Sequence, residues 1–401
     1  MPLSFDPQAA LRYAQGISRP RLVGTAGETA VREELAAQLE SFGCRVERER
    51  FYFWNAANYA LYLQVLLAMI LVALSLIHAL SYHVASLGLL LLLAGFPVIT
   101  KACEWLALFP NTHPDSIFTK VLQLAGLVHS AQNLVAVPND QPASAAGKRL
   151  YFIAHYDSKS QPLPITVRAI LFMVLLTAIA GFILFTLLAS VYSFLTPALF
   201  PIGLIVIGAG APQILNFPGN KSPGAIDNAS AVGVVLHLAE ILQKCPEMRS
   251  GLHITYLLTS AEEMYLLGAS AHAIHHAAEF KQATAEGKLL FLNFDGIGIK
   301  GRLAYDGRGG KTPRGILARL TEEAAQAIGI RITPFRLVGA LFDHIPFARR
   351  NLDAVTLLSI GKASRTIHTR RDTVSQLHPC GFEKTGNLTL EILRRWSNAG
   401  K

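Results

Sequence analysis

The segment RLYFIAHYD, residues 149–157, is the strongest indication of the fold that we predict for this chain. It begins as a short, mostly apolar run rich in β-forming side chains, which is typical of a strand buried in a parallel sheet. His155 and Asp157 stand at its end. Because open α/β sheets bind ligands beyond the carboxyl ends of their strands, the segment predicts a buried strand that leads into a functional site.

Other apolar runs have the same form. Acidic residues or a histidine follow residues 253–259 (Glu262 and Glu263), residues 289–294 (Asp295) and residues 354–360 (His368). Further strands are expected at residues 44–53 and 132–137, and helices at residues 25–42, 230–243 and 312–329. This alternation predicts an α/β fold with a mixed, mostly parallel sheet covered by helices on both faces.

The side chains at these strand ends are of the kind that binds zinc, which takes imidazole nitrogens and carboxylate oxygens. The candidates are His155, Asp227, the pair Glu262-Glu263, Asp295 and His368. Two ions about 3.5–4 Å apart need a carboxylate that bridges them. Only one of the adjacent glutamates need bind metal, so the other is free to take a proton from water. Asp157 shares a strand face with His155 and is placed to hold its second ring nitrogen.

Each candidate also has a structural explanation when it is taken alone. These explanations are a helix N-cap for Asp227, a strand-end turn for Asp295, the first turn of a helix for the glutamate pair, a core position for His155 and an exposed loop for His368. These residues together favour a metal site, although none of them would do so alone.

The order and spacing of the set resemble those of the bacterial leucyl-aminopeptidase-type zinc exopeptidases, a family that also contains glutamate carboxypeptidases and glutaminyl cyclases. The similar blocks are His155–Asp157, Gly224–Ser230, Glu262-Glu263, Asp295, Asp343–Phe347 and His368–Thr373. The resemblance implies two zinc ions bridged by Asp227, one completed by His155 and Asp295, the other by Glu263 and His368. It also implies that Glu262 is the general base of an aminopeptidase, and that Asp157 belongs to the catalytic set.

Two alternatives within this resemblance remain open. One is a single-zinc enzyme similar to glutaminyl cyclase, and the other is an inactive membrane receptor or scaffold on a peptidase fold. The second is disfavoured because every matching position is filled. The chain departs from the family pattern at Ala231, where a glycine is common, and in two interruptions of the domain.

The interruptions are two segments without any Asp, Glu, Lys or Arg, residues 51–100 and 169–220. They contain four apolar runs, Tyr59–Leu80, Val84–Thr100, Ala169–Tyr192 and Leu195–Leu215. Each is close to the roughly 20 residues that a helix needs to cross a bilayer. We therefore predict two transmembrane hairpins, at 59–100 and 169–215, although the fourth run, rich in proline and glycine, is also compatible with a re-entrant segment.

Both hairpins contain an even number of spans, so residues 1–58, 101–168 and 216–401 can form one peptidase domain on one side of the membrane. Lysine and arginine flank the spans on the domain side, and the far-side turns contain neither. The positive-inside rule then predicts an integral protein of the inner or plasma membrane with its catalytic domain in the cytoplasm. Residues 1–21 lack the apolar stretch of a cleavable signal, which agrees with this orientation.

The net charge and the cysteine and histidine content narrow the range of possible partners but do not identify one. A net charge of +9 is dispersed without an aromatic-studded basic stripe, so contact with anionic lipid is favoured over nucleic acid. The four cysteines show no paired spacing, which fits a reducing compartment. His272, His275 and His276 share a predicted helical face and are candidate ligands, but as an exposed helix surface they need no function. The expected substrate is a peptide with a free amino terminus; the oligomeric state is not predicted.

Overall fold

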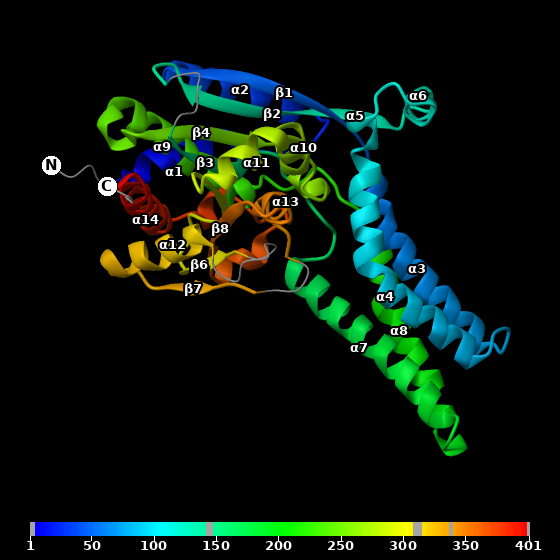
Figure 1. The fold of residues 1–401 in the computed structure, drawn as a ribbon. Coiled ribbons are helices and arrows are strands. Elements are labelled where there is room, and N and C mark those ends of the chain that lie inside the picture. Colours follow the sequence, from blue (N-terminus) through cyan, green and yellow to red (C-terminus); the bar gives the residue numbers. More distant parts are fainter. Residues whose placement is uncertain (1–4, 142–146, 308–314, 337–339, 399–401) are drawn as a thin grey trace. The chain divides into compact units, whose positions relative to one another are not determined.

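The computed structural model describes residues 5–141, 147–307, 315–336 and 340–398 (Figure 1). By its internal contacts the chain divides into two units. An α/β unit comprises Met1–Tyr52, His129–Ser160 and Gly219–Lys401, and a helical unit comprises Phe53–Val128 and Gln161–Pro218. The division into five consecutive parts expected from the sequence stays a prediction.

The α/β unit is built from one sheet and the helices on its two faces. Its strands are β1 (Cys44–Trp54), β2 (Val128–Pro138), β3 (Lys148–His155), β4 (Leu252–Thr259), β5 (Leu289–Asp295), β6 (Arg302–Asp306), β7 (Ile332–Pro334) and β8 (Asp353–Ile360). Its helices are α1 (Pro7–Ile17), α2 (Ala26–Ser41), α9 (Ser230–Lys244), α10 (Leu267–His275), α11 (Ala277–Ala285), α12 (Ile316–Ala327), α13 (His344–Ala348) and α14 (Pro379–Asn398). Short turns of helix lie at Ala225–Ala229, Pro246–Arg249, Glu262–Met264, Lys362–Thr366 and Val374–Gln376.

The sheet has the order β1-β2-β4-β3-β5-β8-β6-β7. Its central strands β4, β3, β5 and β8 pair in parallel, whereas β2 pairs antiparallel with β4 and β6 antiparallel with β8. The predicted mixed, mostly parallel sheet is therefore confirmed. Since the central strands run in one direction, the residues that follow each of them meet at one edge of the sheet.

Strand β3 shows how this sheet is covered on both faces. Leu150 and Phe152 pack into an apolar cluster with α1, α2, α9, α12 and α14, while Tyr151 and Ile153 pack into a second cluster with α10, α11 and α13. Successive side chains of a strand point to opposite faces, and β3 is buried on both, which explains its nearly continuous apolar run.

Some elements differ from the expectation. Strands β6 and β7 were not predicted, and β7 is only 3 residues long and contains Pro334. The helix expected at residues 312–329 is α12, Ile316–Ala327; the first residues of that expectation fall outside the described part of the chain.

The helical unit contains α3 (Ala56–Leu76), α4 (Tyr82–Ala107), α5 (Phe109–Thr112), α6 (Ile117–Leu124), α7 (Ile165–Ala189) and α8 (Leu199–Ile214). The hairpin of α3 and α4 packs against that of α7 and α8 (Figure 1). Gly203 of α8 lies against Val72 and Leu76 of α3, and the Ser86 hydroxyl donates to that of Thr186 at 2.9 Å within the bundle. Small residues and buried interhelical hydrogen bonds are typical of helix packing in membranes.

Large apolar side chains cover the outside of this bundle. Ile77, Leu91 and Val98 are 71%, 63% and 70% exposed. Five helical segments within the described part of the chain are long and apolar enough to cross a membrane. In one of them, Ala225–Lys244, which includes α9, 94% of the residues in the apolar stretch are buried, whereas in the other four at most 28% are. The predicted hairpins lie in those four.

We expect the crossing of α1 and α9 to depend on Gly233. A Cβ at this position would collide with the Ala10 carbonyl oxygen and would lie 3.0 Å from the Ala14 nitrogen. Gly233→Ala should therefore lower the free energy of unfolding by about 1–3 kcal/mol through overpacking. Gly16→Ala, in α1 with no atom within 4 Å, is the matched control and should be neutral or stabilising. Equal thermal stability of the two variants would contradict this account of the crossing.

Candidate metal centre

The sequence-predicted site residues come together at the carboxyl edge of the parallel strands. His155 ends β3, Asp295 ends β5, Glu262 and Glu263 follow β4, and His368 follows β8. Because β4, β3, β5 and β8 are neighbours in the sheet, side chains more than two hundred positions apart meet. All are buried except His368, which is partly buried.

Asp227 lies between the two histidines. Its Oδ1 is 3.1 Å from Nε2 of His155, and its Oδ2 is 3.0 Å from Nε2 of His368. The Asp372 carboxylate accepts the backbone N–H of Asp227 at 3.2 Å and that of Ile226 at 2.7 Å. Asp227 is not the helix cap considered above, because α9 begins at Ser230 and Ala229 occupies the cap position.

The remaining carboxylates complete two groups whose ligand atoms lie within 4.8 Å of one another, His155 with Glu262 and Asp295, and His368 with Asp227 and Glu263. Nε2 of His155 is 3.8 Å from Oε2 of Glu262 and 3.8 Å from Oδ2 of Asp295. Nε2 of His368 is 3.2 Å from Oε2 of Glu263. Asp227 thus presents one oxygen to each histidine.

Asp157 holds the glutamate pair as well as approaching His155. Its Oδ1 accepts the backbone N–H of Glu262 and its Oδ2 that of Glu263, each at 3.2 Å. The Nδ1 of His155 makes its hydrogen bond with the Asp157 backbone oxygen at 3.2 Å, and the carboxylate lies farther away at 3.5 Å. The expected contact with the second ring nitrogen is therefore made mainly by the main chain of Asp157.

The turn that carries the glutamates has an unusual backbone. Ala261, Tyr265 and Leu266 have φ angles of 56°, 67° and 63°. Side-chain-bearing residues rarely adopt this left-handed conformation, and where they do, the surrounding structure holds them there, often at functional sites. His368 has the same feature, with a φ of 63°.

Lys159 and Asp343 belong to the site but were not singled out as site residues from the sequence. The Lys159 ammonium is 2.8 Å from Oε2 of Glu263. In the sequence Lys159 is one of the lysines and arginines that flank the predicted spans on the domain side, and no site role was expected for it. Asp343 is fully buried and accepts a hydrogen bond from Thr259. Two features of the sequence could have indicated them. Lys159 follows shortly after the His155–Asp157 block, and Asp343 begins the Asp343–Phe347 block.

The electrostatics of the site favour bound cations. Burial and the carboxylates of Glu263 and Asp295 raise the pKa of Glu262 well above its usual value, although His155 opposes the rise. Burial and Asp227 likewise raise the pKa of Asp295. Nε2 of His155 is buried and, although Oδ1 of Asp227 lies 3.1 Å away, makes no hydrogen bond of good geometry among the described residues. Metal ions between these groups would favour the charged carboxylates and give the ring nitrogen a partner, so the donor set fits zinc.

We expect Asp157→Asn to reduce turnover about 10- to 100-fold, the usual effect of losing a residue that orients metal-site groups. An asparagine turns one acceptor oxygen into an N–H₂ group that faces the N–H of Glu262 or Glu263. Steady-state kinetics of the variant, with circular dichroism as the folding control, measures the effect. Wild-type kinetics would remove Asp157 from the orienting role.

A mixed α/β sheet with imidazoles and carboxylates gathered at the carboxyl ends of its parallel strands is an architecture of metal-dependent hydrolases. Residues 133–393 match the family model described as Peptidase family M28, and the chain belongs to this family. It is therefore a peptidase, which is a class of hydrolase. Membership of this family supports its assignment as a metallopeptidase.

The individual relatives agree with this assignment. The chain is 26% identical over 178 residues to aminopeptidase YwaD of Bacillus subtilis, a match that covers 42% of this chain and 36% of the relative, so the chain matches only about a third of that protein's length. A zinc aminopeptidase from Bacillus subtilis has a similar solved structure, with a TM-score of 0.57 and 15% identity over 98% of this chain and 95% of that one. A glutaminyl cyclase from an Acidobacteriales bacterium has a TM-score of 0.54 and 15% identity over 100% and 97%. At these identities the structures show a shared fold.

Proposed function

We propose that this protein is a membrane-anchored, zinc-dependent aminopeptidase that removes amino-terminal residues from peptides. The observation that carries the proposal is the position of Asp227, with one carboxylate oxygen 3.1 Å from His155 and the other 3.0 Å from His368. That arrangement suits a carboxylate bridging two ions. The aminopeptidase names of the relatives support the choice of substrate.

In this proposal Asp227 would bridge two zinc ions, His155 and Asp295 would complete the site of one, and Glu263 and His368 would complete the site of the other. When bound, zinc supplies Lewis acidity toward the scissile carbonyl and lowers the pKa of water toward about 7. Lys159 lies beside Glu263 and, with His368, lowers the pKa of that carboxyl to about 2 against the effect of burial. Glu263 is therefore kept in its deprotonated, charged form, which a carboxylate must have to bind a metal ion.

Glu262 is the general base. Its carboxylate takes the proton from the attacking water and later gives it to the leaving amine nitrogen. The two hydrogen bonds from the Glu262 and Glu263 backbone to Asp157 fix the turn from which it acts. The free amino terminus of the substrate binds beside this group of carboxylates.

The helical unit anchors the enzyme. We infer four spans, formed by α3, α4, α7 and α8, with the α/β unit on the cytoplasmic side. The outward-facing apolar residues of the bundle support burial in lipid, and the lysines and arginines that flank the spans support the orientation. Anionic lipid headgroups are the expected partner of these charges.

The decisive assay uses purified full-length protein and a panel of peptides with free or blocked amino termini. We expect cleavage of free peptides only, loss of activity on chelation, and recovery on return of zinc. Cyclisation of amino-terminal glutamine, with one zinc at the Asp227 site, would replace the proposal with a glutaminyl cyclase. No turnover of any peptide by zinc-loaded protein would support the inactive receptor instead.

A further inference from the structure

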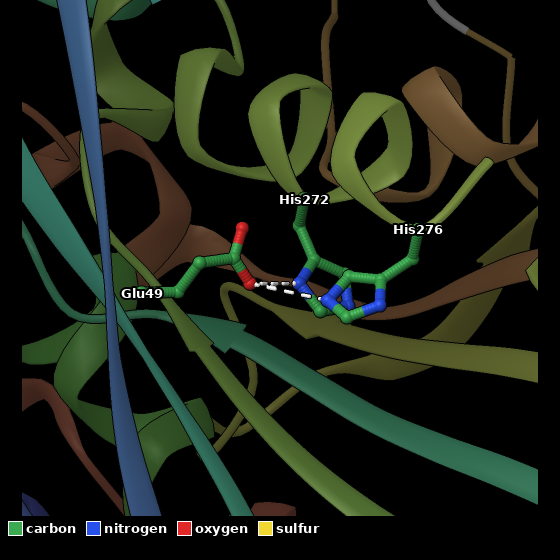
Figure 2. Close-up of side chains that lie close together, drawn as sticks. All are labelled: Glu49, His272 and His276. Carbon is green, nitrogen blue, oxygen red and sulfur yellow. Dashed lines mark hydrogen bonds and ion pairs between the residues drawn. The ribbon is translucent and has the colours of Figure 1, made fainter.

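A second cluster of metal-binding side chains lies in the α/β unit outside the proposed active site. It joins Glu49 of β1 to His272 of α10 and to His276, the residue that ends this helix (Figure 2). One Glu49 oxygen, Oε2, is 2.6 Å from Nδ1 of His272 and 3.5 Å from Nε2 of His276. The sequence suggested an exposed histidine surface here, but His272 is fully buried, so that interpretation is wrong for this residue.

The three side chains offer the donors that zinc prefers, two imidazoles and a carboxylate. The histidines are four positions apart, which brings both to one side of α10, and their ring centroids are 4.4 Å apart. The three ligand atoms lie within 4.8 Å of one another. Ligands on a tetrahedral zinc are separated by about 3.3 Å, given zinc–nitrogen distances of about 2.0 Å, so small side-chain shifts would seat an ion.

His276 is oriented as a metal ligand would be. Its Nδ1 is hydrogen-bonded to Oε2 of Glu279 at 3.1 Å, and Arg149 holds the other oxygen of Glu279. In a neutral ring this bond places the proton on Nδ1 and leaves the lone pair of Nε2 facing the Glu49 carboxylate. A carboxylate on the outer nitrogen is the usual support for a metal-bound histidine. Either a metal ion or a second proton on the ring can lie between Nε2 and Glu49. The proton is the competing occupant, because Glu279 and Glu49 raise the pKa of His276 to about 9 against the effect of burial.

His272 supplies an independent observation. Its Nε2 is buried without a hydrogen-bond partner among the described residues, and rings of Tyr151, Phe280 and Phe347 surround the imidazole with centroids 5.9, 5.8 and 6.3 Å away. If Nδ1 merely donated its proton to Glu49, Nε2 would be a buried, unsatisfied acceptor, which is costly. A metal on Nδ1 would place the proton on Nε2, where aromatic rings are acceptable neighbours for an N–H group.

We propose that Glu49, His272 and His276 form a second transition-metal site, distinct from the one around Asp227, whose ion clamps strand β1 to helix α10. Solvent completes the coordination, since the His276 side chain is 28% exposed. Helix α10 begins just after the Glu262–Met264 turn. The clamp therefore has a positioning role, because it fixes the segment that follows the proposed base.

The test compares zinc bound per chain in purified full-length proteins loaded with Zn²⁺ and freed of excess. We expect His276→Gln and Glu49→Gln each to hold one zinc fewer than the wild type. His275→Gln is the matched control, because His275 is the exposed neighbour outside the cluster; it should keep the full number. The readout is a difference between variants, so it does not depend on how many ions the Asp227 site holds.

Equal zinc content in the wild type, His275→Gln and His276→Gln would overturn the proposal. His276 is half-buried and its replacement leaves no core cavity, so this comparison stands even if a Glu49 variant fails to fold. Glu279→Gln adds a finer measurement. This variant should lower the zinc affinity of the second site, the one that His276→Gln loses, by about 10- to 100-fold, as measured in competition with a chelator. Unchanged affinity would contradict binding through Nε2 of His276.

Discussion

Glu262→Gln should lower turnover by about 100- to 10,000-fold, the usual contribution of a general base, while the zinc content stays at the wild-type level. Glutamine keeps the shape of the side chain but cannot take a proton from water. Steady-state kinetics on a peptide with a free amino terminus, together with metal analysis of the same preparation, measures both quantities.

Glu286→Gln is a suitable control, because this glutamate is exposed and outside the site. Turnover at the wild-type rate in Glu262→Gln would remove Glu262 from the base role. Simultaneous loss of zinc would instead make it a ligand, as its grouping with His155 and Asp295 allows.

Asp227→Asn should reduce activity and zinc affinity more than any other single ligand change, because Asp227 alone among the described residues has a carboxylate oxygen close to each of the two histidines. We expect loss of activity and a fall in zinc affinity at the Asp227 site of more than about 100-fold, since even residues that only support metal ligands contribute about 10- to 100-fold. Zinc titration against a competing chelator, followed by kinetics, measures the change.

The matched control is Asp140→Asn, which removes an aspartate that pairs with Arg249 at the surface of the same unit. Its zinc affinity should equal that of the wild type. If Asp227→Asn binds zinc as tightly as Asp140→Asn does, Asp227 is not a bridging ligand.

The parts of this molecule that could be predicted from the sequence are those whose structure follows from a short stretch of neighbouring residues. Strand β3 has a long apolar run because both of its faces are buried, and His155 and Asp157 stand where that run ends. Strands β6 and β7 lack such a signal. Strand β6 has charged residues at both ends, Arg302 and Asp306, and β7 is short and contains a proline. The position of β6 therefore depends on its pairing with β8, and that of β7 on its pairing with β6, rather than on their own composition.

The site was predictable as a set of residues but not as a set of contacts. Spacing and resemblance indicated Asp227 and the glutamates. The Glu262 and Glu263 amides donate hydrogen bonds to Asp157 from a turn in which Ala261 has a left-handed conformation. An alanine in the sequence does not indicate that conformation. Glu49 and His272 are separated by 223 positions, and no local pattern joins them.

Anomalous diffraction at the zinc edge from crystals of the full-length protein would show whether Asp227 bridges two metal ions. At the Asp227 site we expect two peaks about 3.5–4 Å apart, one beside His155 and one beside His368, with a carboxylate oxygen of Asp227 toward each. A zinc-loaded crystal with no peak at Asp227, or with a single peak that only one histidine reaches, would contradict this expectation.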